Sequence, residues 1–79
     1  PIYHFDFYRL NKPQEAYDIG IEEYFHKNGV VIIEWAETIK DILPKERLEI
    51  SFKIVDENKR VLLIKPFGKA YEDLCEAVL

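Results

Sequence analysis

The chain has 79 residues, of which 48% are hydrophobic and 33% are charged, and its formal net charge is −4 at pH 7. This length allows one small domain, and a chain of this size buries only about 60% of its unfolded surface, so we expect a marginal core. The acidic balance argues against a free-standing nucleic-acid-binding protein, no apolar run approaches the roughly 20 residues of a membrane span, and Cys75 is a single cysteine without a partner for an internal disulfide.

The first predicted strand covers Ile2 to Tyr8, where side chains alternate between two faces. One face carries aromatic residues only: Tyr3, Phe5 and Phe7. We expect this aromatic face to pack on the core. The opposite face places His4 and Asp6 close to the end of the strand, which is an unusual place for ordinary surface residues.

Two short helices are predicted next. Pro13 suits the first turn of a helix over Pro13–Asp18, and Gly20 ends that helix. Ile21–His26 has apolar side chains at spacings of three and four and predicts a second short helix. Turn residues at Lys27–Gly29 then lead into the next strand.

The stretch Gly29–Trp35 is the predicted centre of the sheet. Four consecutive β-branched aliphatic residues follow the glycine and predict a strand buried on both faces, in the middle of a parallel or mixed sheet. The run stops at Glu34 and at Trp35, the only tryptophan. Because ligands of open α/β sheets bind beyond the carboxyl ends of the strands, Glu34 is the first candidate site residue.

The sequence next predicts a short helix over Ala36–Leu43, followed by a hairpin. Strands at Leu48–Ile54 and Arg60–Lys65 flank a polar turn and are expected to pair antiparallel. The residues Pro66–Gly68 are expected to break the sheet.

The last predicted element is an amphipathic helix over Lys69–Leu79. Its apolar stripe includes Cys75, which we interpret as a core thiol and not a nucleophile. The predicted order is β-α-α-β-α-β-β-α, an α/β fold with an antiparallel hairpin at one edge of the sheet.

Asp6 and Glu34 are the candidate catalytic and metal-binding pair. Each follows an apolar run at or near the end of a strand, so both converge on one crevice if the two strands are neighbours. Mg²⁺ is typically held by one or two carboxylates beside a substrate phosphate. The alternative for Asp6 is an ion pair with Arg9 or the cap of a turn, whereas Glu34 needs a compensating partner.

Three nearby residues each have a functional and a structural interpretation. Trp35 is either a stacking surface for a base or an apolar plug at the start of the next helix. His4 either orients a ligand or shuttles a proton, or it is a structural hydrogen-bonding group. Arg9 either meets a phosphate or forms a surface salt bridge. The sequence contains no G-x-x-x-x-G-K-[ST] phosphate loop, and carboxylates alone cannot hold a triphosphate.

Five segments together resemble the TsaE (YjeE) family of bacterial P-loop ATPases, which serve threonylcarbamoyl modification of tRNA adenosine next to the anticodon. The segments occur in the family's order and at matching spacing: His4–Leu10, Asp18–Phe25, Ile33–Glu37, Ile42–Pro44 and Arg47–Leu48. The closing Gly68–Glu76 helix resembles members from Gram-positive bacteria.

The resemblance implies a P-loop NTPase-like mixed sheet, Mg²⁺-dependent hydrolysis of ATP to ADP, and a cytoplasmic complex with TsaB- and TsaD-type subunits. It implies that tRNA is reached only indirectly, through that complex. Asp6 becomes the metal-side acid, and Glu34 and Trp35 belong to the nucleotide site. Tyr8 and Arg9 become cofactor contacts.

The phosphate-binding N-terminal half of this family has no counterpart among residues 1–79. We therefore interpret residues 1–79 as the C-terminal portion of a single TsaE-like ATPase domain, with the P-loop half as a required partner. Two other functions stay open. One is a non-catalytic protein-docking module that uses the aromatic surface, and the other is a metal-dependent phosphodiesterase that uses His4, Asp6 and Glu34.

Overall fold

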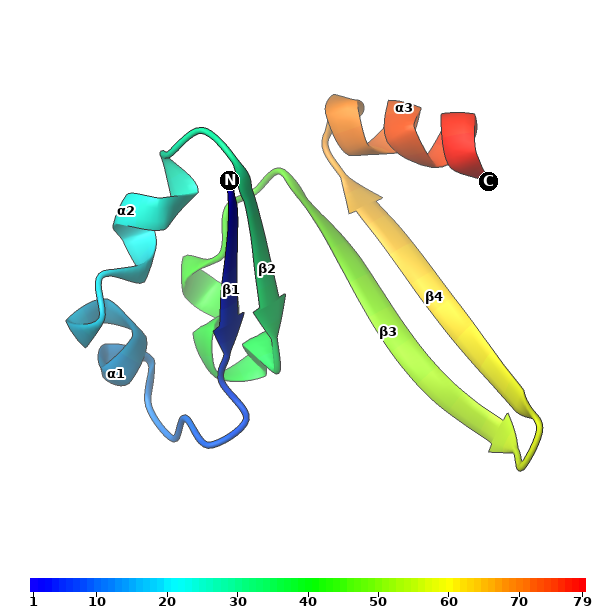
Figure 1. Ribbon diagram of the computed structural model, residues 1–79, viewed down its shortest axis with the longest axis horizontal. Helices are drawn as coiled ribbons and strands as arrows, with labels where there is room; N and C mark the ends of the chain where they lie inside the picture. Colours follow the sequence, from blue (N-terminus) through cyan, green and yellow to red (C-terminus); the bar gives the residue numbers. More distant parts are fainter. The chain divides into compact units, whose positions relative to one another are not determined.

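The computed structural model describes residues 1–79 as two compact units, Pro1–Leu43 and Pro44–Leu79 (Figure 1). The first unit holds a parallel two-stranded sheet and the second an antiparallel one. The α/β class is confirmed. The single mixed sheet that we expected is wrong for these residues, because no strand of the first sheet pairs with a strand of the hairpin. None of the helices is both long and apolar enough to cross a membrane.

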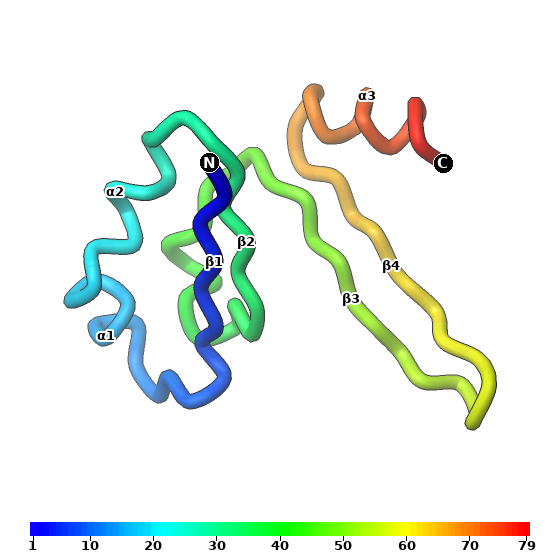
Figure 2. Tube along the Cα trace, viewed as in Figure 1, coloured from blue at the N-terminus to red at the C-terminus, as the bar shows by residue number.

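The first unit alternates strands with short helices, and its two strands run side by side in the same direction (Figure 2). Its elements are β1 (Ile2–Asp6), α1 (Pro13–Asp18), α2 (Ile21–Phe25), β2 (Val30–Glu34) and the 3₁₀-helix η1 (Ala36–Ile42). Pro13 opens α1 after an extended Lys12, and Gly20 separates α1 from α2 in a left-handed conformation with φ of 75°. Both local signals match the prediction.

The core of the first unit lies on one face of the parallel sheet. Its fully or nearly buried side chains come from the end of β1 and from the three helices: Phe7, Ala16, Ile21 and Ile39. Phe5 and Ile33 pack against this cluster from the sheet. All three helices contribute to the same cluster, so the apolar burial that stabilises this unit is concentrated on that face.

The opposite face of the parallel sheet is open. Val30 is 57% exposed and Ile32 is 47% exposed, so residues 1–79 by themselves bury only one of the two faces of β2 that we expected to be buried. The physical reason is that all the helices of the unit cover the face that carries Phe5 and Ile33. His4, Asp6 and Glu34 share this open face.

Gly29 sits where the two parallel strands begin, and its φ of 142° is one that L side chains rarely adopt. A Cβ at this position would lie 2.5 Å from the main-chain oxygen of Pro1, which accepts a hydrogen bond from the Val30 N–H. We expect Gly29→Ala to lower the free energy of unfolding by about 2–3 kcal/mol, through strain and loss of this contact.

The matched control for this change is Gly20→Ala. Gly20 also has a positive φ, yet a Cβ there meets nothing within 4 Å. Only the left-handed backbone penalty remains, so the loss is expected to be about 1 kcal/mol. Urea denaturation of both variants measures the difference, and an equal or larger loss in Gly20→Ala contradicts the assignment.

The predicted helix after Trp35 is the 3₁₀-helix η1 and not an α-helix. It is interrupted at Ile39, whose φ and ψ of −108° and 20° are not helical. This kink directs Ile39 into the core, where its side chain is fully buried. Thr38 ties η1 to the loop after β1, because its hydroxyl donates to the Leu10 carbonyl at 3.2 Å.

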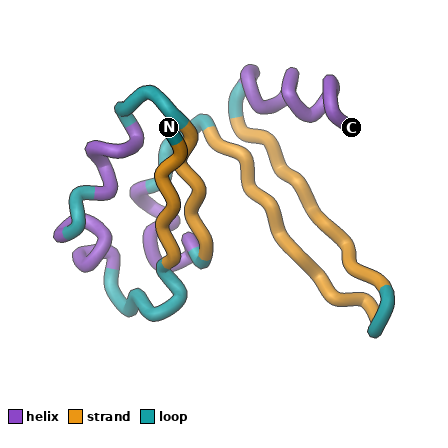
Figure 3. Tube along the Cα trace, viewed as in Figure 1, coloured by secondary structure: helices purple, strands orange, loops and turns teal.

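The second unit is a long hairpin followed by a helix (Figure 3). Its elements are β3 (Arg47–Asp56), β4 (Lys59–Phe67) and α3 (Lys69–Val78). The expectation that Pro66–Gly68 breaks the sheet is wrong in part, because Pro66 and Phe67 belong to β4 and Pro66 pairs with Leu48. A proline is tolerated here because β4 has a neighbour on one side only.

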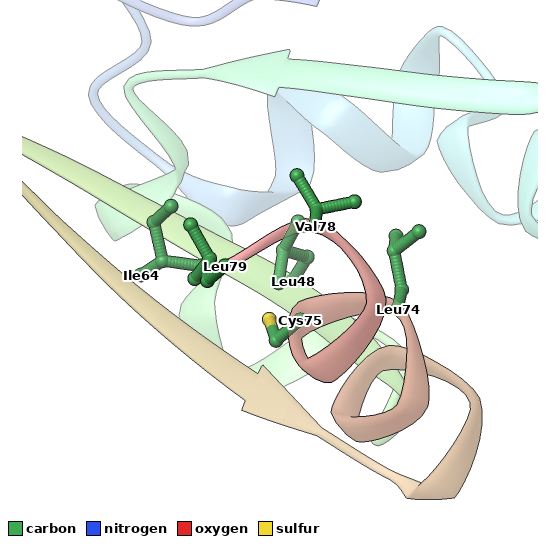
Figure 4. A pocket seen from close by; sticks show the side chains of 6 residues that line it. All are labelled: Leu48, Ile64, Leu74, Cys75, Val78 and Leu79. Carbon is green, nitrogen blue, oxygen red and sulfur yellow. The ribbon is translucent and has the colours of Figure 1, made fainter.

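Helix α3 lies against the hairpin through its apolar stripe, and a small apolar pocket of about 130 Å³ lies between them (Figure 4). Apolar side chains and the thiol line it: Leu48, Ile64, Leu74, Cys75, Val78 and Leu79. Cys75 is half-buried among these side chains. This environment agrees with a packing role for the thiol.

Candidate functional site

The candidate site lies at the carboxyl ends of β1 and β2. Asp6 and Glu34 are register partners in the parallel pair, and Phe7 N–H donates to the Glu34 main-chain oxygen at 3.0 Å just beyond them. Both side chains belong to the exposed half of their strand's alternation. The two acids that the sequence singled out are therefore direct neighbours on one face of the sheet.

Each acid has one oxygen held by a hydrogen bond. The Tyr8 N–H donates to Asp6 Oδ1 at 3.1 Å, and His4 Nε2 lies 2.9 Å from Glu34 Oε2. Asp6 thus caps the turn after β1, which is one of the two structural alternatives, and forms no ion pair with Arg9. Glu34 has the compensating partner that its position requires.

The sequence grouped His4 with Asp6 and Glu34 in one candidate set but did not predict the hydrogen bond between His4 and Glu34. The contact is diagonal across the two strands, because His4 pairs in register with Ile32 and Glu34 pairs with Asp6. The sequence did contain one signal for this site. His4 and Asp6 are two residues apart, so their side chains lie on the same face of a strand. The parallel register was needed to bring Glu34 to the same place.

Tyr8 and Trp35 form an aromatic pair beside the two acids. Their ring centroids lie 5.0 Å apart with an interplanar angle of 63°, which is an edge-to-face contact. Both remain open to solvent, with Tyr8 65% exposed and Trp35 61% exposed. Within residues 1–79, Trp35 therefore does not belong to the core of the first unit.

The backbone of Trp35 is left-handed, with φ of 59° and ψ of 51°, and Trp35 is the only non-glycine residue with a positive φ. Such a conformation costs free energy for a bulky residue, and strained residues of this kind cluster at functional sites. Arg9 lies in the exposed turn after β1 and forms no ion pair, so its guanidinium is available to a ligand.

The donor set fits a hard divalent cation in one specific way. The chain has no cluster of three or more His, Cys, Asp or Glu side chains suited to a metal ion. A metal cage built by residues 1–79 alone is therefore not supported. Asp6 and Glu34 do supply two neighbouring carboxylates, each with one oxygen free of hydrogen bonds within the chain. This matches Mg²⁺, which keeps several waters and takes one or two carboxylates together with substrate phosphates.

Comparison with known proteins identifies the family. A family model described as "Threonylcarbamoyl adenosine biosynthesis protein TsaE" matches residues 1–62. The tRNA threonylcarbamoyladenosine biosynthesis protein TsaE of Bacillus subtilis is 43% identical over 76 residues, which are 96% of this chain and 47% of that protein. The protein of the same name from Rickettsia typhi is 45% identical over 64 residues, which are 81% of this chain and 44% of that protein.

The fold comparison agrees with the sequence comparison. The crystal structure of Bacillus subtilis YdiB superposes with a TM-score of 0.80 at 40% identity and covers 98% of this chain and 47% of that one. The chain thus spans about half the length of the curated relatives and of the solved structure that it matches. With a matching family model over most of its residues, the chain belongs to the TsaE family.

Proposed function

We propose that these residues are part of a magnesium-dependent ATPase that supports threonylcarbamoyl modification of tRNA adenosine next to the anticodon. One observation carries the proposal: Asp6 and Glu34 are register partners at the carboxyl ends of two parallel strands, on one face, beside an exposed aromatic pair. The names of the relatives support the pathway.

The two acids have different roles in this proposal. Asp6, with Oδ1 fixed by the turn, would hold the metal through its other oxygen and a water molecule. Glu34 would orient the metal or the attacking water with the oxygen that His4 does not occupy. Bound Mg²⁺ supplies charge stabilisation at the transferred phosphoryl group, and positioning is the main task left to the protein.

The nucleotide contacts come from the residues next to the acids. Trp35 packs near the nucleotide, and Tyr8 supports the Trp35 ring through the edge-to-face contact. Arg9 reaches a phosphate oxygen from the exposed turn. A phosphate cradle from a P-loop half completes the site, because residues 1–79 contain no such loop.

The proposal also includes the cellular compartment and the partner subunits of the protein. The ATPase acts in the cytoplasm within an assembly of TsaB- and TsaD-type subunits, and it meets tRNA only through that assembly. The chain's net charge of −4 agrees with this indirect route, because direct binding of nucleic acid normally requires a basic surface.

Nucleotide binding tests the proposed site directly. In the protein with its phosphate-binding half, Trp35→Leu is expected to weaken ADP binding about 10-fold, since a desolvated aromatic contact contributes about 0.5–1.5 kcal/mol beyond its buried area. Isothermal titration calorimetry measures the change. Phe52→Leu is the matched control, because Phe52 is a 73% exposed aromatic residue on the hairpin. Equal affinity of wild type and Trp35→Leu for ADP contradicts the assignment of Trp35.

A second candidate function is a non-catalytic docking module. It is favoured by the hairpin, where Phe52 and Ile54 are 73% and 69% exposed on the same face of β3. A well-behaved monomer in size-exclusion chromatography, with no change of Trp35 fluorescence on adding ADP and Mg²⁺, supports docking over the ATPase.

A further inference from the structure

We propose that His4 is a positioning residue for Glu34, and that its imidazole holds the carboxylate in the orientation that the nucleotide site needs. The inference rests on the proposed ATPase function and adds to it a role for His4, which that function does not assign.

The contact itself is within ordinary hydrogen-bond distance. His4 Nε2 lies 2.9 Å from Glu34 Oε2. With the Glu34 carboxylate oxygen as the acceptor, the Nε2–H of His4 is the donor of this bond. The parallel register fixes this geometry, because it places Glu34 two positions beyond the direct partner of His4 on the adjacent strand.

The hydrogen bond divides the Glu34 carboxylate into two oxygens with different tasks. Oε2 is held by His4, and Oε1 remains for a ligand. Asp6 is arranged in the same way, with Oδ1 held by the Tyr8 N–H and Oδ2 free. Two neighbouring acids therefore each present one oxygen whose direction is set by a second group of the chain. Partners of this kind orient metal-ligating groups, and their loss typically costs about 10–100-fold in metal affinity or activity.

Stability of the fold does not account for the pair. The side chains of His4 and Glu34 are each 55% exposed. Exposed pairs of this kind contribute little to stability. Neither residue belongs to the core cluster of the first unit. The structural benefit of the contact is small, and its position at the acids indicates a role in presenting Glu34.

Two variants of His4 separate the hydrogen bond from the bulk of the ring. His4→Phe keeps an aromatic ring and removes the donor. His4→Gln keeps a donor nitrogen at the same number of bonds from Cβ as Nε2. In the protein with its phosphate-binding half, kcat for ATP hydrolysis is expected to fall about 10–100-fold in His4→Phe and to stay within about 3-fold of wild type in His4→Gln.

A second measurement does not depend on turnover. Calorimetry gives Kd for ADP with and without Mg²⁺, and the ratio of the two is the coupling between metal and nucleotide. We expect this ratio to fall toward 1 in His4→Phe and to be retained in His4→Gln. The value of Kd without Mg²⁺ is expected to be the same in all three proteins, and equal urea midpoints show that the fold is intact.

The outcomes distinguish this inference from the proposed function. Wild-type kcat and coupling in His4→Phe, together with an inactive Glu34→Gln, overturn the role of His4 and leave the ATPase in place. Equal losses in His4→Phe and His4→Gln also overturn it, because the hydrogen bond is then not the cause. Wild-type kcat in Glu34→Gln overturns the ATPase assignment of Glu34 and, with it, the basis of the inference.

Discussion

Glu34→Gln is expected to lower kcat for ATP hydrolysis at least about 100-fold in the protein with its phosphate-binding half, with the fold unchanged. The substitution removes the negative charge and keeps an oxygen that accepts the hydrogen bond from His4. The variant therefore tests the negative charge of Glu34 and not the geometry of its hydrogen bond with His4. Removal of one preorganised electrostatic group at a reacting centre typically costs about 100–1,000-fold in kcat.

Two measurements accompany this variant. Urea denaturation is expected to show a change below about 1 kcal/mol, because the His4–Glu34 pair is exposed. Glu37→Gln is the matched control: Glu37 is an exposed glutamate three residues along the chain, in the first turn of η1. We expect wild-type kcat in Glu37→Gln. Similar losses of kcat in both variants would show that net charge, and not the position of Glu34, determines the rate.

Local signals predicted the helices of the first unit well. Pro13 and Gly20 bound α1, and the structure begins and ends that helix at Pro13 and Asp18 as expected. Such signals work because proline at the first turn and glycine with a positive φ act within a few residues of themselves. The 3₁₀ character of η1 was not predicted, since it arises from tertiary packing of Ile39 at a kink.

The apolar pattern of β2 predicted the burial of its two faces less reliably. A run of aliphatic residues indicates side chains that avoid water, and it does not say which element covers them. In this structure one face of β2 packs on the helices and the other, with Val30 and Ile32, is open. Two-face burial was inferred from four consecutive β-branched residues, and within residues 1–79 the two-stranded sheet is covered on one face only.

The candidate site was predictable in part. Strand ends located Asp6 and Glu34, because a carboxylate that follows an apolar strand leaves the core at a defined place. The hydrogen bond from His4 depends on the register between strands 30 residues apart in sequence, which no local pattern encodes. The left-handed backbone of Trp35 was likewise not predicted, since that conformation is rare for large side chains.

Ile39→Ala is expected to have the largest effect on stability, a loss of about 3–5 kcal/mol in the free energy of unfolding. Ile39 is fully buried and belongs to a core of only four buried residues. Truncation of a buried isoleucine removes its transfer free energy and leaves a cavity that a small core cannot fill by relaxation. Urea denaturation measures the loss, and Ile19→Ala, at a 53% exposed position, is expected to cost below about 1 kcal/mol.

Ile39→Ala and Glu34→Gln are expected to have opposite effects on the stability of the fold and on kcat. Ile39 anchors η1, which begins directly after Trp35, so the core and the site are adjacent in the chain but separate in role. Well below its unfolding transition, Ile39→Ala is expected to keep kcat within about 3-fold of wild type, whereas Glu34→Gln loses kcat and keeps its stability. A large loss of kcat in folded Ile39→Ala would show instead that the packing of η1 sets the geometry of Glu34 and Trp35.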